Sequence, residues 1–437
     1  MTQLNKPLDR LNIFSLSSPQ MRTFHTTWLT FFACFFGWFG LAPLMPTIRE
    51  DLGLTKAQVG NTIIAAVSAT IIARLVIGRL CDTWGPRKTY TTLLVICSIP
   101  VFLVGLSNNY ITFLLFRFAI GIIGASFVIT QYHTSMMFAA NIKGTANAVA
   151  GGWGNLGGGV TNIVMPIIFA GIVGWGFSKH DAWRLAMIVP GTLLLICAVL
   201  YWRFTQDSPE GNYEDIKRTQ TATEKPNIRE VLTDWRVWAL AIAYSICFGM
   251  EITFDNVASL HFVDTFKVDQ KMAGLLAGSF GLMNIFARAL GGIFSDKIGK
   301  TYGLSGKGWL LAAFISVEGL GILCFSGAST LTSAILWMLS FALFLKMANG
   351  ATYALTPFIN PKNVGLVAGI VGAGGNIGGM MMGFLFKNPS ITYAMAFSYI
   401  GYTALAIALI IGLTKFGRVP KTVDLPEVMV EVAASPA

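Results

Sequence analysis

Two arginines lie deep inside apolar stretches and at matching places in the two halves of the chain. Arg74 and Arg288 each have apolar neighbours on both sides. An arginine at the centre of a membrane-spanning helix costs about 2.5–3.5 kcal/mol on insertion scales, so we expect the pair to face the bundle interior and to act together. Each could instead snorkel to the membrane surface or pair with a carbonyl or an acid. A guanidinium presents a planar fork of donors, and the matched pair therefore predicts a site for a small planar anion.

Two glycine-rich segments, GGWGNLGG at 151–158 and GAGGNIGG at 372–379, form a second repeated feature. Glycine costs about 1 kcal/mol relative to alanine inside a helix. Small residues four apart allow helices to approach closely, and close packing alone is one reading. It leaves unexplained why Asn155 and Asn376 occupy the same place in both segments, where their amides could donate to an anion without adding charge. We assign a role in helix closure to five of the glycines, which are Gly151, Gly154, Gly158, Gly375 and Gly379.

A pair of acids breaks the symmetry of the two halves. Glu251 and Asp255 lie four residues apart in an apolar stretch and hence on one helix face. A carboxylate inside the membrane is a functional candidate by default, and Glu251 is our candidate for loading and releasing a proton. A salt bridge that holds helices together is the alternative. Asp255 is read as a packing or gate residue, and Arg117 and Lys346 could each pair with a carboxylate.

The spacing around the two arginines is itself repeated. Gly78, Asp82 and Gly85 follow Arg74 at the same intervals as Gly292, Asp296 and Gly299 follow Arg288. We therefore expect Asp82 and Asp296 to act in the conformational change. Two parallel repeats related by an axis along the membrane normal are typical of transporters whose binding site lies between two rocking halves.

The elements that must position these residues are membrane helices. The 437 residues are 54% hydrophobic and 12% charged, with a mean hydropathy of +0.63, whereas soluble chains carry about 25% charged residues. A helix needs roughly 20 apolar residues to span the bilayer. We expect an all-α membrane protein with twelve transmembrane helices in two six-helix repeats, at 24–48, 60–80, 89–107, 111–139, 143–174, 183–204, 235–263, 271–294, 308–327, 329–357, 363–386 and 392–414.

A polar stretch divides these spans six and six. We expect a first bundle at 1–204, a cytoplasmic linker at 205–234, a second bundle at 235–414 and a cytoplasmic tail at 415–437. The net charge of +10 comes from basic residues in alternate loops. That pattern indicates membrane topology with both termini in the cytoplasm, not nucleic-acid binding. Because the chain carries no phosphate loop, nucleophile elbow or zinc-ligand spacing, we expect no enzyme activity, cofactor or metal, and transport driven by gradients.

Several motifs resemble the major facilitator superfamily. GRLCDTWGPRK at 78–88, the weaker copy GGIFSDKIGK at 291–300, and Arg117 with Gly121 are similar to its helix and loop motifs. The doubled glycine helix, GTANAVAGGWGNLGGG at 144–159 and GLVAGIVGAGGNIGG at 365–379, resembles the nitrate signature of the nitrate/nitrite porter family. The stretches 125–132, 251–257 and 277–292 resemble the high-affinity nitrate transporter branch of plants, algae and cyanobacteria.

The resemblance implies that Arg74 and Arg288 hold the anion. The matching aromatic and amide positions are Phe127, Asn155, Tyr244, Phe248 and Asn376. In this reading the tyrosine donates its hydroxyl, the phenylalanines sandwich the flat anion, and Glu251 couples its movement to protons. We do not expect an accessory subunit of the plant type, because the central loop and the tail are short.

The expectation is a multi-pass transporter of the cell membrane that imports nitrate, and nitrite as a further candidate, by alternating access as a proton symporter. A negative inside potential costs about 2.3 kcal/mol per charge per 100 mV, so import of an anion requires at least two protons. Nitrate/nitrite exchange, transport of another small oxyanion, and a sensor without turnover are the alternatives.

Overall fold

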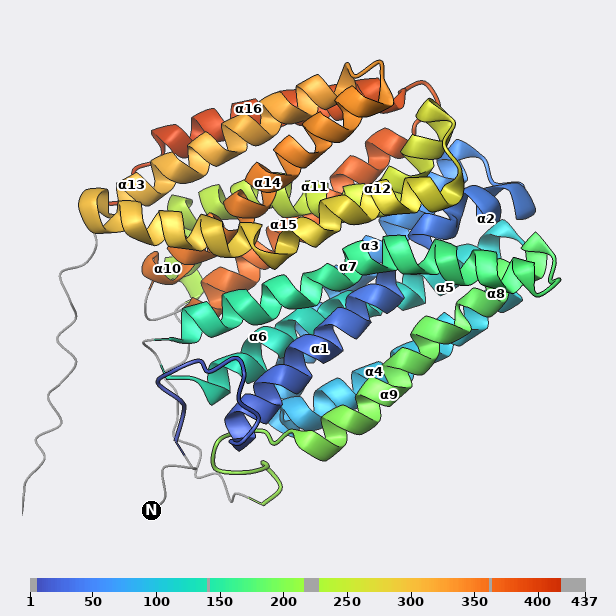
Figure 1. The fold of residues 1–437 in the computed structure, drawn as a ribbon. Helices are drawn as coiled ribbons and strands as arrows, with labels where there is room; N and C mark the ends of the chain where they lie inside the picture. Colours follow the sequence, from blue (N-terminus) through green and yellow to red (C-terminus); the bar gives the residue numbers. More distant parts are fainter. Residues whose placement is uncertain (1–5, 140–141, 216–227, 361–363, 418–437) are drawn as a thin grey trace, which may run out of the picture.

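The computed structural model describes residues 6–139, 142–215, 228–360 and 364–417. In these residues every regular element is a helix, and strand-like pairing is limited to isolated bridges such as that of Leu8 with Phe138 (Figure 1). The expected all-α class is therefore confirmed.

The first half of the chain folds into long helices joined by short loops and 3-10 turns. Its helices are α1 (Pro19–Phe39), α2 (Met45–Asp51), α3 (Lys56–Trp84), α4 (Pro86–Leu103), α5 (Tyr110–Gly121), α6 (Ser126–Met137), α7 (Lys143–Gly174), α8 (Lys179–Ala186) and α9 (Ile188–Phe204). Several of these helices begin with a capping residue. Ser18 caps α1 with proline following it, and Thr55 forms a capping box with Gln58 at the start of α3.

The second half follows the same plan after the short helix α10 (Ile228–Thr233). Its long helices are α11 (Trp235–Phe266), α12 (Gln270–Leu282), α13 (Ala287–Ser326), α14 (Leu331–Leu355), α15 (Val364–Lys387) and α16 (Tyr393–Leu413). The turn between α11 and α12 is local in origin. Lys267 ends α11 in the left-handed conformation (φ 56°), and Asp269 accepts from the amide of Met272 to cap α12.

Eleven segments of the described residues are long and apolar enough to cross a membrane. One of them, Gln270–Ser326, has 57 residues, about twice the length of the others. Within it Gly303 adopts φ 66° and ψ −155°, a conformation that only glycine tolerates readily, and Figure 1 shows α13 reversing direction. This segment therefore crosses twice and raises the number of crossings to twelve, as expected. The loop expected between 294 and 308 is instead a helix folded back at one glycine.

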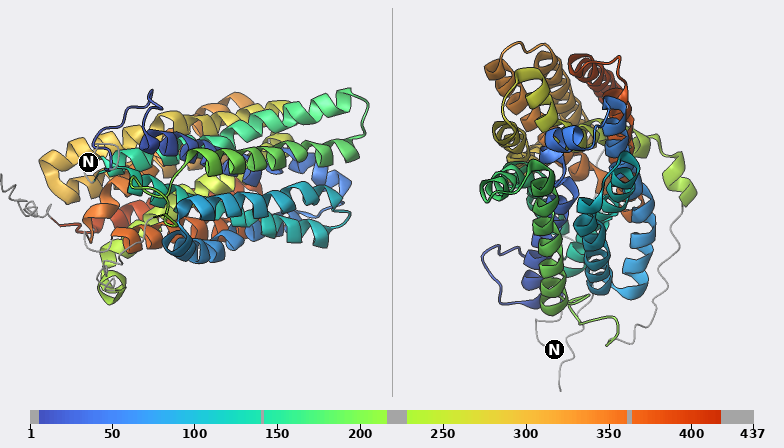
Figure 2. Two further views of the ribbon diagram at one scale, coloured as in Figure 1. Left: turned by 90° about the horizontal axis from the view of Figure 1, so that it is seen from below. Right: turned by 90° about the vertical axis from the view of Figure 1, so that its right-hand side faces the viewer.

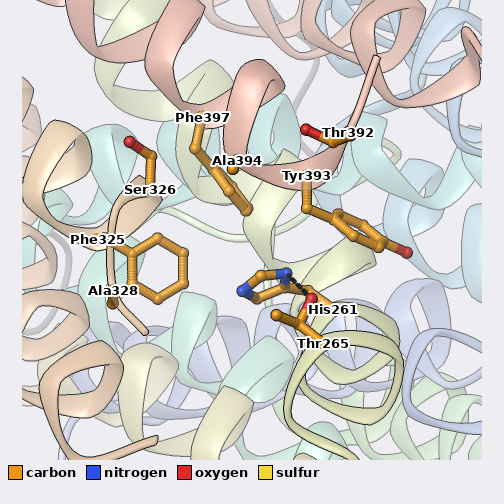
Figure 3. Close-up of a pocket in the computed structure, with 9 residues that line it drawn as sticks. All are labelled: His261, Thr265, Phe325, Ser326, Ala328, Thr392, Tyr393, Ala394 and Phe397. Atoms are coloured by element: carbon orange, nitrogen blue, oxygen red, sulfur yellow. Dashed lines mark hydrogen bonds between the residues drawn. The ribbon is translucent and has the colours of Figure 1, made fainter. Parts of the chain in front are cut away.

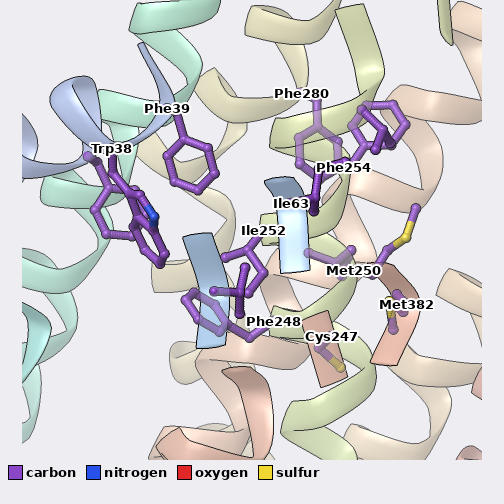
Figure 4. Packing of buried hydrophobic residues seen from close by; sticks show 14 of the residues in the cluster. Trp38, Phe39, Ile63, Cys247, Phe248, Met250, Ile252, Phe254, Phe280 and Met382 are labelled. Atoms are coloured by element: carbon purple, nitrogen blue, oxygen red, sulfur yellow. The ribbon is translucent and has the colours of Figure 1, made fainter. Parts of the chain in front are cut away.

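Four helix pairs organise the packing within the halves and between them. In the first half α1 packs on α7, and in the second half α11 packs on α15. Across the halves α7 packs on α12 and α3 packs on α15. The views in Figure 2 show the long helices running side by side along one axis. The core between the halves is aromatic and aliphatic, with Trp38 and Phe39 of α1 facing Phe248 and Ile252 of α11 (Figure 4).

One end of the bundle, remote from the N-terminus, joins the two halves through polar contacts. Arg49 of α2 forms a salt bridge to Asp264 of α11 at 2.8 Å. Gln270 accepts from the hydroxyl of Thr47 at 2.6 Å and donates to the carbonyl of Pro43 at 2.9 Å. We call these contacts the latch. They hold the halves together at this end of the molecule.

Candidate anion-binding site

Arg74 reaches from α3 of the first half toward α15 of the second. Its Nη1 donates to the carbonyl oxygen of Gly372 at 3.1 Å, and its Nη2 donates to that of Gly124 at 3.4 Å. The guanidinium carbon lies 5.3 Å from the ring centroid of Phe127, and Nε has no hydrogen-bond partner. In the described part of the chain no carboxylate forms a salt bridge with Arg74. Its positive charge is therefore not compensated by an acid there.

Arg288, the second residue of α13, has a different environment. Its Nη2 donates to Oε2 of Glu251 at 2.7 Å, and its Nε donates to Oδ1 of Asn284 at 3.1 Å. Its guanidinium carbon lies 5.8 Å from the ring centroid of Phe248. Each of the two repeat-related arginines thus has a phenylalanine ring beside it, but only Arg288 of the two has a carboxylate partner among the described residues.

Four aromatic rings connect the surroundings of the two arginines. Tyr244 stacks on Phe248 with their centroids 5.0 Å apart and an interplanar angle of 4°. Tyr353 of α14 lies edge-on to Tyr244 at 5.0 Å and to Phe127 at 6.1 Å. We call these four residues the aromatic wall. They come from three helices, α6, α11 and α14.

Tyr353 is a candidate that the sequence analysis missed. Its hydroxyl is buried without a hydrogen-bond partner, and a methyl group built on Gly372 would lie 3.2 Å from it. The internal repeat holds a signal that could have found it, because Phe127 lies in the fourth predicted span and Tyr353 in its counterpart, the tenth.

Asn155 lies on α7 with both side-chain amide atoms unpaired and 2% of its surface exposed. Glycines one turn away face residues of the site. A methyl group on Gly151 would lie 3.8 Å from the ring of Phe127, and one on Gly152 would lie 3.4 Å from the carbonyl of Asn284. An unpaired buried amide costs about 1–3 kcal/mol, so Asn155 lacks a partner that a bound ligand could provide.

Asn376 shares its partner with Arg74. Its amide nitrogen donates to the carbonyl oxygen of Gly372 at 3.1 Å, while its own oxygen is unpaired. One residue before it, Gly375 lies against the stacked rings, since a methyl group there would lie 2.7 Å from both Tyr244 and Phe248. The second glycine helix therefore supports the aromatic wall directly.

The other glycines assigned to closure also mark close approaches. A methyl group would lie 1.9 Å from Phe31 at Gly154, 3.1 Å from the Asp255 carboxylate at Gly158 and 2.4 Å from Ile252 at Gly379. These distances show close packing, and a role in movement stays a prediction. Of the two repeated aspartates, Asp296 pairs with Lys307 at 2.6 Å. The side chain of Asp82 lies outside the described part of the structure.

Glu251 is the centre of a buried polar cluster. Its Oε1 accepts from Lys346 Nζ at 2.9 Å and from Asn284 at 2.8 Å. Its Oε2 accepts from Arg288 and, at 2.7 Å, from Asn349. Lys346 thus pairs with a carboxylate, as the sequence suggested, and this geometry is that of the salt-bridge alternative for Glu251. Arg117 instead donates to the side-chain oxygen of Asn256 at 2.9 Å.

The charge balance of this region favours an anion. Arg74, Arg288 and Lys346 provide three positive charges, Glu251 pairs with the last two, and Asp255 lies one turn from Glu251. Even with both acids charged, one positive charge is left uncompensated. Residues grouped as metal ligands are not found in the described ranges.

A separate pocket of about 240 Å³ lies near the latch (Figure 3). His261, Phe325, Tyr393 and Phe397 are among the residues that line it, and no lysine or arginine is among them. Since it lacks a cation, it is not the anion site.

Comparisons with known proteins agree with this architecture. Residues 27–383 match the family described as the Major Facilitator Superfamily. High affinity nitrate transporter 2.5 of Arabidopsis thaliana is 38% identical over 92% of this chain and 81% of its own length. Nitrate transporter 2.2 of Chlamydomonas reinhardtii is 37% identical over 91% of this chain and 80% of its own. The nitrate/nitrite transporter NrtP of Nostoc punctiforme is 27% identical over 91% and 92%.

Solved structures share the fold at low sequence identity. A bacterial homologue of the human lysosomal transporter Spinster, in an inward-facing and unoccupied conformation, is 16% identical with a TM-score of 0.66 over 91% of this chain and 95% of that chain. A D-xylose-proton symporter is also 16% identical, with a TM-score of 0.67 over 90% and 97%. These neighbours establish the fold alone. Together with the matched family and relatives, they confirm the resemblance found in the motifs: the chain belongs to the Major Facilitator Superfamily and, within it, to the family of the high-affinity nitrate transporters.

Proposed function

We propose that this chain is a secondary transporter that imports nitrate by alternating access in symport with protons. The observation that carries the proposal is the guanidinium of Arg74, which reaches the aromatic wall and the second half of the molecule without a carboxylate partner in the described residues. The names of the relatives, which are nitrate and nitrite transporters, support the choice of substrate.

Electrostatic energy favours an anion beside Arg74. An uncompensated charge in a protein interior is strongly unfavourable, and a partner of opposite charge removes much of that cost. Arg74 binds backbone carbonyl oxygens, which supply partial negative charge, and its Nε is free. A monovalent anion between Arg74 and Arg288 would supply the missing charge. In contrast, a cation or a neutral sugar would leave Arg74 uncompensated.

The shape of the surroundings favours a small flat anion. Phe127 and Phe248 each lie beside one arginine, and Tyr244 and Tyr353 lie between them. Nitrate is planar, so it can lie against a ring face while its oxygens accept from a guanidinium fork. We assign the hydroxyl of Tyr353, free of partners in this structure, to the anion as a further donor.

The two asparagines complete the proposed site. Asn155 has both amide atoms unpaired, and Asn376 keeps one amide hydrogen on Gly372. Each amide can donate to a nitrate oxygen without adding charge to the site. The glycines around them let α7 and α15 close on the substrate.

Alternating access requires that the site open to one side of the membrane while a gate closes the other side. Basic residues in alternate loops support cytoplasmic termini, which makes the latch the extracellular gate of a protein in the cell membrane. The salt bridge of Arg49 with Asp264 then closes the outside in this state. The two six-helix bundles rock about the site, and the repeated Asp82 and Asp296 act at the cytoplasmic ends of the arginine helices. The partners in this proposal are nitrate or nitrite, protons and the lipid bilayer.

Protons supply the driving force in this proposal. Because inward movement of an anion is opposed by about 2.3 kcal/mol per 100 mV, at least two protons must accompany each nitrate. Glu251 is our candidate for one of them. Here Arg288 and Lys346 hold it as a carboxylate. An anion that binds Arg288 competes for that guanidinium, and the weakened hold lets Glu251 take up a proton.

Nitrate/nitrite exchange is the second candidate, and one observation favours it. Glu251 accepts hydrogen bonds from four side chains, so it can serve as a permanent structural anion. Exchange requires no protonatable group and should survive Glu251→Gln, whereas proton-driven uptake should fail.

The experiment is uptake of labelled nitrate into proteoliposomes with and without an inward proton gradient. The native chain is compared with Arg74→Lys, Arg288→Lys and Glu251→Gln. Accumulation that depends on the gradient and is lost in all three variants supports symport. Counterflow that survives Glu251→Gln supports exchange. Absence of nitrate flux in the native chain, with another oxyanion carried instead, would reject nitrate as the substrate.

A further inference from the structure

We infer that Asp255 is a second proton-carrying carboxylate of the transport cycle, an inference that rests on the proposed function. Asp255 lies one turn beyond Glu251 on α11 and is 3% exposed. Its Oδ1 has no hydrogen-bond partner, and no salt bridge to it is found among the described residues. Glu251, by contrast, is fully hydrogen-bonded on both oxygens.

The groups around Asp255 come from both halves of the molecule. The charged neighbours are Glu251 on its own helix, Lys346 on α14 and Arg288 on α13. Lys346 and Arg288 both donate to Glu251, which leaves Asp255 without a bonded cation. From the first half α7 presents the backbone of Gly158, where a methyl group would lie 3.1 Å from Oδ2 of Asp255. The α7 residues after Lys143 include no charged side chain.

The next residue on α11 reinforces this division. Asn256 accepts a hydrogen bond from Arg117 of α5 at 2.9 Å, so that nearby cation is bound to a neutral amide. Neither Arg117 nor Lys346 therefore compensates Asp255 by a direct bond.

This environment favours the neutral acid. Burial disfavours the charged form of a carboxyl group, and an unpaired carboxylate inside the membrane is expensive. A protonated carboxyl removes that cost, whereas a permanent structural carboxylate would be expected to have a bonded partner, as Glu251 has.

The position between the halves ties this proton to the conformational change. Asp255 is covered on one side by α7, which belongs to the first half. When the halves separate at the latch, α7 moves away from α11 and water reaches the carboxylate. Oδ1 then accepts a proton from the extracellular side, and closure of α7 over the neutral acid no longer buries a charge.

Release follows from the substrate's charge. Nitrate bound beside Arg288 offsets the positive potential of the cluster and favours the protonated acid. After nitrate leaves, opening of the halves on the cytoplasmic side brings water to Asp255, so its carboxylate is no longer an unsolvated charge. The proton then leaves toward the cytoplasmic side past Glu251. One proton enters and one leaves in each cycle. Together with Glu251, Asp255 gives the two protons that import requires.

Glu318 of α13 provides a matched control. It is also fully buried, and neither of its oxygens has a hydrogen-bond partner. The groups beside its carboxyl are Cys247 and Glu251 of α11, and its neighbours Gly319 and Gly321 pack on α16 and α14, all of which belong to the second half. The two carboxyl groups share burial and the lack of a salt bridge in the described part of the chain but differ in their place relative to the moving interface.

The test measures the number of protons carried per nitrate in proteoliposomes, from the nitrate accumulation reached at set membrane potentials and pH gradients. Asp255→Asn mimics the neutral acid and should lower the ratio by one while counterflow stays within about threefold of native. At 100 mV the loss of one charge, about 2.3 kcal/mol, lowers accumulation by about 50-fold. Glu318→Gln should keep the native ratio.

Three results would overturn the inference. The first is a native ratio in Asp255→Asn, and the second is a ratio lowered in Glu318→Gln instead. The third is that the purified native chain takes up no proton when nitrate is added in weak buffer, a measurement that needs no variant. Asp255→Ser replaces Asp255→Asn if the latter does not fold. Gradient-driven nitrate flux with an unchanged ratio rejects this inference alone, whereas no nitrate flux by the native chain rejects the proposed function with it.

Discussion

Arg74 and Asn376 donate to the same carbonyl oxygen, that of Gly372, each at 3.1 Å. This oxygen joins an arginine helix of the first half to the glycine helix of the second. An anion that takes over the Arg74 donor would release this bond between the halves, which relates binding of the substrate to their relative movement.

The two arginines should differ in their contribution to stability. Arg288→Met leaves Glu251 with one cation fewer, and breaking a buried pair costs about 3–5 kcal/mol. Arg74→Met removes a charge that has no acid partner among the described residues, so we expect stability to be unchanged or increased. Thermal unfolding of the purified proteins measures both. A lower midpoint for Arg74→Met than for Arg288→Met would contradict the proposed difference in pairing.

Added nitrate should test the role of Arg74 in a second way. The native chain and Glu318→Gln should unfold at a higher temperature in nitrate than in an equal concentration of chloride, because a ligand of the folded state stabilises it. Arg74→Met should lose this shift. A full shift in this variant would show that nitrate binds elsewhere.

Removal of Lys346 should compensate part of the stability lost when Glu251 is replaced. Glu251→Gln leaves Lys346 and Arg288 without their carboxylate partner, and we expect a loss of about 3–5 kcal/mol. Adding Lys346→Met removes one of the two unpaired cations, so the double variant should recover part of that loss. Unfolding midpoints for the four combinations form a double-mutant cycle. Additive losses would mean that the two side chains do not interact as the structure shows.

The hydroxyl of Tyr353 should contribute to substrate affinity but not to stability. It makes no hydrogen bond in this structure, so Tyr353→Phe should leave the unfolding midpoint unchanged. If the hydroxyl donates to the anion, loss of about 0.5–1.5 kcal/mol should raise the KM for nitrate roughly 2- to 10-fold. Initial rates of uptake over a range of nitrate concentrations measure this change. An unaltered KM would exclude the hydroxyl as a donor.

Gly375 should be sensitive to a single methyl group. Gly375→Ala places a methyl carbon 2.7 Å from Tyr244 and Phe248 and must displace the stacked rings. We expect at least tenfold slower uptake, since small displacements of binding groups reduce rates strongly. Gly369→Ala is the matched control on the same helix, because nothing lies within 4 Å of its added carbon. Equal effects of the two changes would point to helix propensity as the cause.

Much of the architecture follows from the sequence, because the apolar length of a single stretch is enough to predict a membrane helix. The lengths of the apolar stretches predicted all twelve crossings, and the internal repeat showed that Arg74 and Arg288 occupy equivalent positions in the two halves. The reversal inside α13 was predicted as an ordinary loop, since hydropathy falls over 295–307 whether the chain unwinds or turns back at Gly303.

The pairing of side chains was decided by the tertiary structure. Lys346 lies 95 residues from Glu251, and no local pattern records that they meet at 2.9 Å. Arg74 and Arg288 are equivalent by spacing, yet one binds a carboxylate and the other a backbone carbonyl, because only the second repeat has an acid on its facing helix. The lack of a hydrogen-bond partner at Oδ1 of Asp255 arises in the same way. Whether a buried charge has a partner depends on which helices pack together, and that relationship exists only in three dimensions.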